Sequence, residues 1–271
     1  MKNEKVFYYS DPVNDDFAGT NINTCHVPAC FCYIHKSVAY KILCFIVYYI
    51  IAFPLVWLMA KLFLGLKLKN RKNVKKAEGG FFLYGNHTNM LDAYIPSIAS
   101  FPKKGYIVAG PDTVSIPGIK LLVVMLGAMP LPSELKGYRA FIDAINTRIK
   151  EGASVTVYPE AHIWPYYTGI RPFPDTSFRY PVANGAPVIA MVTTYRKRKG
   201  LFALCKRPGM TVTFSEPMKA DSSLPQKQAQ KELRNRVFDF MNTVSKETEQ
   251  VSYIRYEQKK EEKEPAAQTE Q

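Results

Sequence analysis

The chain has 271 residues, 47% of them hydrophobic and 22% charged, which is the composition of a folded globular protein and not of a disordered one. Its formal net charge of +13 predicts a partner of negative charge, for which nucleic acid and an anionic membrane surface are the usual candidates. The five cysteines form no even framework for disulfide bonds, so the simplest interpretation is a reduced, intracellular protein.

Residues 1–37 are mostly polar and show little periodicity, so they predict an irregular arm without a signal peptide. The arm contains several residues of the types that bind zinc, namely Cys25, His26, Cys30, Cys32 and His35. Their spacing matches no paired Cys-x-x-Cys pattern. Free thiols close to a membrane anchor are therefore the preferred interpretation, and a zinc site is the alternative.

An uncharged apolar run extends from Ile42 to Ala60, between Lys41 and Lys61, and predicts a membrane-anchoring helical segment over residues 38–66. As a helix, this run would be about 28 Å long, close to the hydrocarbon thickness of a bilayer. Pro54 interrupts the run, so either one kinked helix spans the membrane or a bent pair of helices enters one leaflet. The alternative is a helix buried in the core of the domain.

A run of basic residues follows this segment, with no acidic residue among residues 67–77: Lys67, Lys69, Arg71, Lys72, Lys75 and Lys76. Positive charge next to an apolar anchor marks the cytoplasmic side of a membrane and binds anionic lipid head groups. The alternative, a nucleic-acid surface, lacks a recognition motif and interleaved stacking aromatic residues. The expected location is the cell membrane, with the catalytic domain on its cytoplasmic face and no nucleic-acid partner.

Strands and helices alternate over residues 67–252, which predicts an α/β domain with a central mixed sheet flanked by helices. The expected strands are 81–85, 105–109, 154–158, 187–193 and 211–214, with a short extended piece at 128–131. The expected helices are 91–100, limited by Pro96, 115–125, started by Ser115 and Pro117, 134–150, capped by Ser133, and 225–250. Residues 253–271 are rich in Glu, Lys and Gln and are expected to form a disordered tail.

Asn86, His87 and Asp92 follow the first expected strand of this domain. On a continuous helix, residues five apart point about 140° away from each other, so His87 and Asp92 can meet only across a turn. A strand–turn–helix supplies that turn, and the Asp92 carboxylate would then orient the imidazole ring and make its free nitrogen more basic. The alternative is that Asp92 only favours the start of the helix and that His87 is a turn residue.

Four blocks in this order resemble the motifs of the glycerolipid acyltransferases, the family that includes lysophosphatidic acid acyltransferases. Asn86-His87-x4-Asp92 is similar to the first motif, and residues 127–133 (GAMPLPS) lie where the second is expected. Residues 157–160 (VYPE) resemble the start of the third motif, Phe-Pro-Glu-Gly-Thr-Arg, and residues 185–190 (GAPVIA) resemble the fourth. The blocks fall in the predicted α/β domain, so the resemblance covers its central part.

The resemblance implies an O-acyltransferase that moves a fatty acyl group directly from a thioester, acyl-CoA or acyl carrier protein, to a hydroxyl of a lysophospholipid or related lipid. His87 would be the general base on that hydroxyl, and Asp92 would orient it. No metal ion, cofactor or acyl-enzyme is implied beyond the donor substrate, in agreement with the lack of a serine or cysteine nucleophile motif near His87. The expected partners are a membrane lipid and the thioester donor.

The departures from these motifs concern the acceptor. The family's third motif continues with Gly-Thr-Arg, where this sequence has Ala161, His162 and Ile163, and the arginine that closes the second motif falls on Ser133. Because arginine is the natural bidentate ligand of phosphate, either other cations bind the acceptor or the acceptor is not a plain glycerol phosphate. The candidate substrate-binding residues are Glu160, His162, Lys136, Arg139, Arg171 and Arg179. The alternative for Glu160 is an ion pair with Arg171 or Arg179.

Two other classes of protein are compatible with this sequence. His87, Asp92, Glu160 and His162 have the types and number of side chains that hold zinc or iron in a metal-dependent hydrolase. The missing arginines are also compatible with a catalytically silent membrane-surface protein that keeps the same fold.

Overall fold

The computed structural model describes residues 5–18, 24–115 and 118–259. Its centre is a seven-stranded sheet with the order β2-β8-β7-β3-β6-β4-β5. Neighbouring strands are parallel except for β7 and β8, so the predicted α/β fold with a central mixed sheet is confirmed. The strands are β2 (Lys67–Lys69), β3 (Phe81–Gly85), β4 (Gly105–Ala109), β5 (Ala128–Pro130), β6 (Ser154–Val157), β7 (Val188–Arg196) and β8 (Gly209–Phe214).

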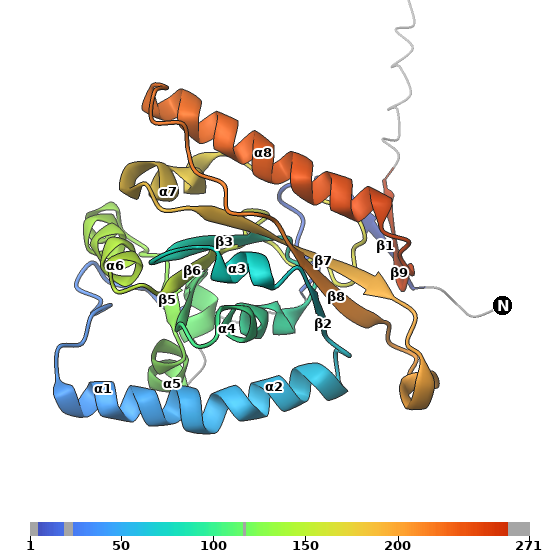
Figure 1. The fold of residues 1–271 in the computed structure, drawn as a ribbon, viewed down its shortest axis with the longest axis horizontal. Helices are drawn as coiled ribbons and strands as arrows, with labels where there is room; N and C mark the ends of the chain where they lie inside the picture. Colours follow the sequence, from blue (N-terminus) through green and yellow to red (C-terminus); the bar gives the residue numbers. More distant parts are fainter. Residues whose placement is uncertain (1–4, 19–23, 116–117, 260–271) are drawn as a thin grey trace, which may run out of the picture.

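Helices cover both faces of this sheet (Figure 1). One face packs against α6 (Tyr138–Lys150), α7 (Arg179–Asn184) and α8 (Gln226–Glu247), in a core that includes Phe141 and Leu233. The other face packs against α2 (Phe53–Leu62), α3 (Lys72–Lys75) and α4 (Ile95–Ser100), with Ile95 and Ile98 in the core. The connections contain α5 (Lys120–Met125) and 3₁₀ turns at Met90–Tyr94, Pro111–Val114, Leu135–Gly137, Thr176–Phe178 and Gly200–Phe202.

The carboxyl ends of the central strands form an edge of the sheet at which a ligand-binding site can lie. All residues of β3 are buried, and so are all residues of β7 except its last, as expected for strands that are covered on both faces. Because β3, β4, β5 and β6 are parallel neighbours, their carboxyl ends meet at one edge. In α/β folds that edge is the usual place for ligand binding.

The apolar run forms one continuous helix, Val38–Leu62, made of α1 (Val38–Phe45), a π-helical segment (Ile46–Ala52) and α2. The π-helical segment ends just before Pro54, which has no backbone N–H to donate to an ordinary helical hydrogen bond. The helix lies across one end of the domain, on the side opposite to α8 (Figure 1). It is long and apolar enough to cross a membrane, and only 6% of its apolar window is buried, so the core-helix alternative is wrong.

Several helices begin later than predicted. Pro96 stands in the first turn of α4, where its missing N–H is tolerated, and does not limit the helix. Ser115 follows a 3₁₀ turn, whereas α5 begins further on, and Pro117 lies outside the described residues. Ser133 caps no helix, because its hydroxyl accepts a hydrogen bond from the Val27 backbone N–H at 3.0 Å.

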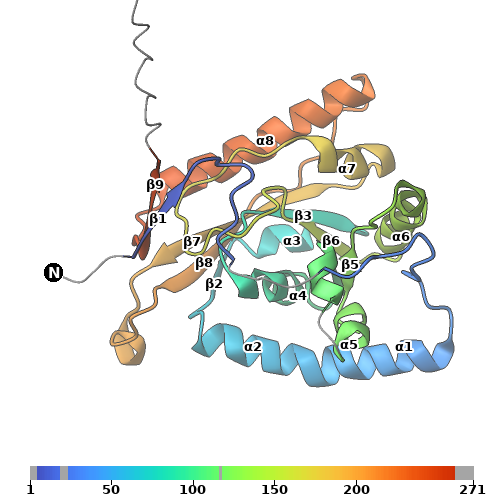
Figure 2. The same ribbon diagram turned by 180° about the vertical axis from the view of Figure 1, so that it is seen from behind.

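A second, two-stranded sheet joins the two ends of the described chain. β1 (Lys5–Tyr9) pairs in parallel with β9 (Ile254–Gln258), beside β7 (Figure 2). The predicted irregular arm therefore contains a strand, and the prediction of a disordered tail is wrong for residues 254–258; residues 260–271 lie outside the described residues. The reason is aromatic packing, because the Tyr256 ring stacks on Trp164 at 4.9 Å and packs against Phe7 at 5.6 Å.

Candidate active site

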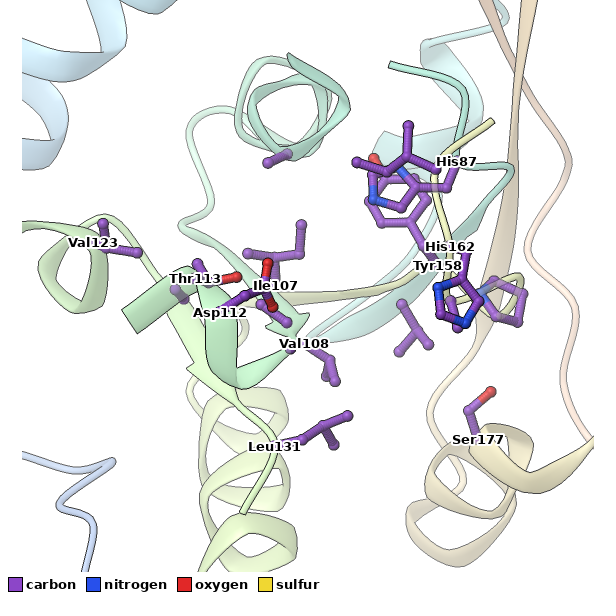
Figure 3. A pocket seen from close by; sticks show the side chains of 18 of the residues that line it. His87, Ile107, Val108, Asp112, Thr113, Val123, Leu131, Tyr158, His162 and Ser177 are labelled. Atoms are coloured by element: carbon purple, nitrogen blue, oxygen red, sulfur yellow. The ribbon is translucent and has the colours of Figure 1, made fainter. Parts of the chain in front are cut away.

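A cleft of about 1190 Å³ lies at the edge of the sheet where β3, β4, β5 and β6 end. Apolar residues of the long helix and α5 line one part of it, among them Ala52, Phe53, Val56 and Val123. Polar residues of the arm, the loop after β6 and α7 line another part, among them Asp16, His162, Ser177 and Arg179. Figure 3 shows Val123 and Ser177 on opposite sides of the cleft, with His87 on its wall.

His87 stands in the turn after β3, and Asp92 lies in the 3₁₀ turn that follows. Their side chains meet, with 3.3 Å between His87 Nδ1 and Asp92 Oδ2. The same carboxylate oxygen accepts hydrogen bonds from the backbone N–H groups of Thr88 at 2.7 Å and Asn89 at 2.8 Å. Asp92 thus contacts the imidazole and also completes the capping box of the turn, and its role in catalysis stays a prediction.

The surroundings of this pair favour His87 Nε2 as the nitrogen that meets a substrate. Asp92 is fully buried, and the His87 side chain is 16% exposed to the cleft. The imidazole stacks on the Tyr158 ring at 4.4 Å (Figure 3), and the Tyr158 hydroxyl donates to the Asp92 carbonyl oxygen at 2.7 Å. Burial, with the negative charge of Asp92 added, raises the pKa of Tyr158 well above its ordinary value, so this phenol stays a hydrogen-bond donor.

The loop after β6 holds the turn that contains His87 from the other side. The Trp164 backbone N–H donates to the His87 carbonyl oxygen at 3.1 Å, and the Tyr166 N–H donates to that of Thr88 at 2.9 Å. Trp164 is itself fixed, because its indole N–H donates to the Asp15 carbonyl oxygen of the arm at 2.7 Å. The arm, the loop and the turn therefore form one hydrogen-bonded unit.

Glu160 lies behind the turn and does not line the cleft. Its carboxylate accepts hydrogen bonds from the backbone N–H groups of His87 at 3.2 Å and Arg171 at 3.1 Å, and lies 3.4 Å from the Arg171 guanidinium. That guanidinium also donates to the carbonyl oxygens of Glu160 and His162. Burial raises the pKa of Glu160, and the Arg171 charge opposes this. The pair supports the loop, as in the alternative of an ion pair between Glu160 and Arg171, and neither residue lines the cleft.

The other predicted substrate-binding residues divide into two groups. His162 and Arg179 line the cleft, as predicted for residues that contact a substrate. Lys136 and Arg139 are exposed outside it, which corrects their prediction. Arg139 is exposed because α6 turns Phe141 and its neighbours into the core, whereas Lys136 is exposed in the 3₁₀ turn before that helix.

Two features of the site escaped prediction. Asp16 of the arm reaches the cleft, where its carboxylate lies 3.7 Å from His162 Nδ1, and no local pattern connects segments so far apart in sequence. The Asn86 side chain exchanges two hydrogen bonds with the Thr193 backbone of β7, at 3.0 and 2.8 Å, and so fixes the turn to the sheet. The position of Asn86 directly before His87 is the signal that points to this role.

The geometry does not support the two metal-binding alternatives. Over residues 5–18, 24–115 and 118–259, no group of three or more His, Cys, Asp or Glu side chains is placed to hold a metal ion. In the proposed hydrolase site, the Glu160 carboxylate is engaged by Arg171. In the arm, Cys32 and His35 lie 3.7 Å apart without a third ligand, and the five cysteines are free thiols.

The comparisons with known proteins agree with this geometry. Residues 65–194, just under half of the chain, match the family model described as Acyltransferase. The fold is similar to the crystal structure of the 1-acyl-sn-glycerophosphate (LPA) acyltransferase PlsC from Thermotoga maritima, with a TM-score of 0.53 and 18% sequence identity. The likeness covers 80% of this chain and 87% of that chain. Comparison with the sequences of curated proteins gives no match.

The fold of this chain is thus similar to that of an LPA acyltransferase. Residues 65–194 match the acyltransferase family model, which agrees with the resemblance seen in the ordered sequence blocks. The matched segment contains His87, Asp92 and the supporting pair of Glu160 and Arg171, whereas the arm and the long helix precede it. The catalytic roles of His87 and Asp92 stay predictions.

Proposed function

We propose that this protein is an O-acyltransferase that moves a fatty acyl group from a thioester donor to a hydroxyl of a lysolipid at a membrane surface. The observation that carries the proposal is the His87–Asp92 pair, 3.3 Å apart, on the wall of a cleft of about 1190 Å³ in an acyltransferase-family domain. Small-molecule sites commonly have roughly 300–1,000 Å³. The cleft therefore has room for an acyl chain and a head group together.

His87 acts as the general base through Nε2. It takes the proton of the acceptor hydroxyl while the hydroxyl oxygen forms a bond to the thioester carbonyl carbon. The carbon–sulfur bond then breaks, and the leaving thiolate takes the proton back from His87. Asp92 holds the imidazole through Nδ1 and stabilises the imidazolium that exists between the two proton transfers, because a fully buried carboxylate favours a cation beside it.

The apolar part of the cleft is assigned to the acyl chain of the donor, which is acyl-CoA or acyl-acyl carrier protein. Its walls are side chains of the long helix and α5, which also face the proposed membrane surface. The polar part, with His162 and Arg179, is assigned to the head group of a lysophospholipid or related lipid. The likeness in fold to an LPA acyltransferase supports a lipid acceptor.

The long helix is assigned to the plane of the membrane. Its inner side packs on the domain through buried residues such as Cys44, Tyr48 and Ala60. Its outer side exposes a row of apolar residues: Ile42, Leu43, Phe45, Ile46, Ile50, Ile51, Leu55, Trp57, Leu58 and Leu62. Since buried residues near both ends of the helix contact the domain, we assign the helix to the membrane interface and not to a span across the bilayer. The basic residues 67–76 follow its end and favour anionic lipids on the cytoplasmic face.

Acyl transfer from radiolabelled palmitoyl-CoA or palmitoyl-acyl carrier protein to a panel of lysolipids tests this proposal. His87→Ala in the full chain should lower transfer by about 10²–10⁴-fold, the usual contribution of a general base. His26→Ala is the matched control, because this histidine is exposed and pairs with Glu134 at the surface, 2.7 Å away. Near-normal transfer by His87→Ala overturns the assigned role. No transfer by the unaltered protein from either donor favours the catalytically silent alternative.

A further inference from the structure

The charges on the wall of the cleft do not suit a strongly anionic head group. Among the described residues that line it, Arg179 is the cation, whereas Asp16 and Asp112 are carboxylates. These three charged side chains give the wall a net negative charge. A phosphate monoester, which has a charge of about −1.5 to −2 at neutral pH, would enter against this charge.

Arg179 is nevertheless placed to bind one anionic oxygen. Its guanidinium lies against the rings of Tyr138 and Tyr180, 5.9 and 5.1 Å from their centroids, and in the described part of the chain it forms no ion pair. Its Nε–H is buried and has no hydrogen-bond partner among these residues. Since Arg179 lines the cleft and forms no ion pair among the described residues, its guanidinium is available to an anionic group of the ligand.

The arm covers the two positions at which this sequence lacks the motif arginines. The Phe17 backbone N–H donates to the Ile163 carbonyl oxygen at 3.3 Å. The Ser133 backbone N–H donates to the Val27 carbonyl oxygen at 3.1 Å, and the Val27 N–H donates to the Ser133 hydroxyl at 3.0 Å. Asp16 directly precedes Phe17, so the arm brings a negative charge next to Ile163.

The Asp16 carboxylate is held in place and still has an oxygen free for a ligand. The preceding residue, Asp15, is fixed by the Trp164 indole N–H at 2.7 Å. Asp16 Oδ1 accepts a hydrogen bond from the Ala18 backbone N–H at 2.9 Å. Asp16 Oδ2 lies 3.7 Å from His162 Nδ1, beyond hydrogen-bond distance, and the side chain is 43% exposed. This oxygen is available to a donor with a positive charge.

We propose, on the basis of the acyl-transfer function above, that the acceptor is a lysolipid with a zwitterionic head group, in which a singly charged phosphodiester stands next to an ammonium group. Arg179 binds the phosphodiester and Asp16 binds the ammonium. The cleft discriminates against a phosphate monoester, because such a group has more negative charge than one arginine balances and has no cation for Asp16.

The test uses the full chain in neutral detergent micelles at a fixed salt concentration, with palmitoyl-CoA and palmitoyl-acyl carrier protein as donors. Three acceptors with the same acyl chain are compared: lysophosphatidylethanolamine, lysophosphatidylglycerol, which has the phosphodiester without the amine, and lysophosphatidate, which has the monoester. The expected kcat/KM is highest for the ethanolamine lipid and at least about ten-fold lower for lysophosphatidate, the discrimination that 1.4 kcal/mol supplies.

Variants separate the two contacts. Asp16→Asn should lower kcat/KM about ten-fold for the ethanolamine lipid and leave kcat/KM for the glycerol lipid unchanged. The matched control is Asp239→Asn, because Asp239 is an exposed residue of α8. Arg179→Met should lower kcat/KM for the ethanolamine lipid and for the glycerol lipid by the same factor. Arg179→Lys should lower them less than Arg179→Met, because lysine keeps the positive charge. Equal or better use of lysophosphatidate, or an equal effect of Asp16→Asn on all acceptors, overturns the zwitterion proposal while the acyltransferase function stands. Failure of all three acceptors with both donors instead counts against the function itself.

Discussion

Replacing Arg171 by methionine removes the cation that faces the buried Glu160 carboxylate. Both side chains are 1% exposed, so solvent does not weaken their interaction as it does at a surface. Removing one partner of such a pair costs about 3–5 kcal/mol, because the other charge is left buried and unpaired. Methionine keeps an apolar stem against the Trp164 ring, which lies 5.0 Å from the guanidinium. The expected loss in unfolding free energy at neutral pH is therefore about 3–5 kcal/mol.

This loss should shrink as the pH falls. Burial raises the pKa of Glu160 above its ordinary value of 4.5, and Arg171 is the largest influence that opposes the rise. Without Arg171 the pKa rises further. A carboxyl group whose pKa is raised on folding stabilises the folded state fully only below its unfolded pKa, and this stabilisation is lost as the pH rises through its folded pKa. The difference in unfolding free energy between the variant and the unaltered protein is thus smallest at acidic pH and largest above neutral pH.

Urea titrations of the full chain in detergent, followed by tryptophan fluorescence at several pH values, measure the effect. The Glu160→Gln/Arg171→Met double variant removes both charges and should recover at least half of the loss, with little dependence on pH. A loss below about 1 kcal/mol, the value of a surface pair, would refute the reasoning. An equal loss at every pH would refute it as well.

Three further predictions concern the turn, the loop and the long helix. Asp92→Asn should lower kcat about 10²–10⁴-fold with little change in KM, because an amide does not stabilise the imidazolium; an unchanged kcat in steady-state assays removes Asp92 from the mechanism. Ala161→Gly should raise the unfolding free energy by about 0.5–1 kcal/mol, since Ala161 has a φ of 62° that glycine adopts without strain; a lower midpoint in thermal denaturation would contradict this. Replacing Ile50 and Ile51, which are 60% and 58% exposed, with glutamate should weaken vesicle binding. Each lost apolar side chain should cost about 1 kcal/mol of binding free energy, so flotation assays should show roughly 30-fold weaker binding. Unchanged binding would place the membrane contact elsewhere.

The strands around the site could be predicted closely because their signals are local. Phe81–Gly85 and Gly105–Ala109 are strands with the predicted limits, since each is a short apolar run with polar residues or glycine beside it. The turn between His87 and Asp92 followed from the period of a helix alone, and their contact at 3.3 Å agrees with it. Such arguments need only the residues within one supersecondary unit.

Contacts between distant segments could not be predicted in this way. In the sequence Arg171 looks like a cation free to bind phosphate, and only the folded chain places it opposite Glu160. Asp16 reaches the cleft because the arm is hydrogen-bonded to the loop at Ile163, a contact that no local pattern encodes. The polar composition after residue 252 likewise predicts disorder, because it does not show that Tyr256 stacks on Trp164 and so stabilises a strand there.

The pairing of β1 with β9 has a consequence for how the molecule is made. These strands are neighbours in space although they lie near opposite ends of the chain. During synthesis the long helix leaves the ribosome well before β9, so it has emerged while β1 still has no strand to pair with. The strand β1 therefore pairs only when β9 has emerged. Under the proposed function, the long helix is thus available to the membrane before the sheet of β1 and β9 has formed.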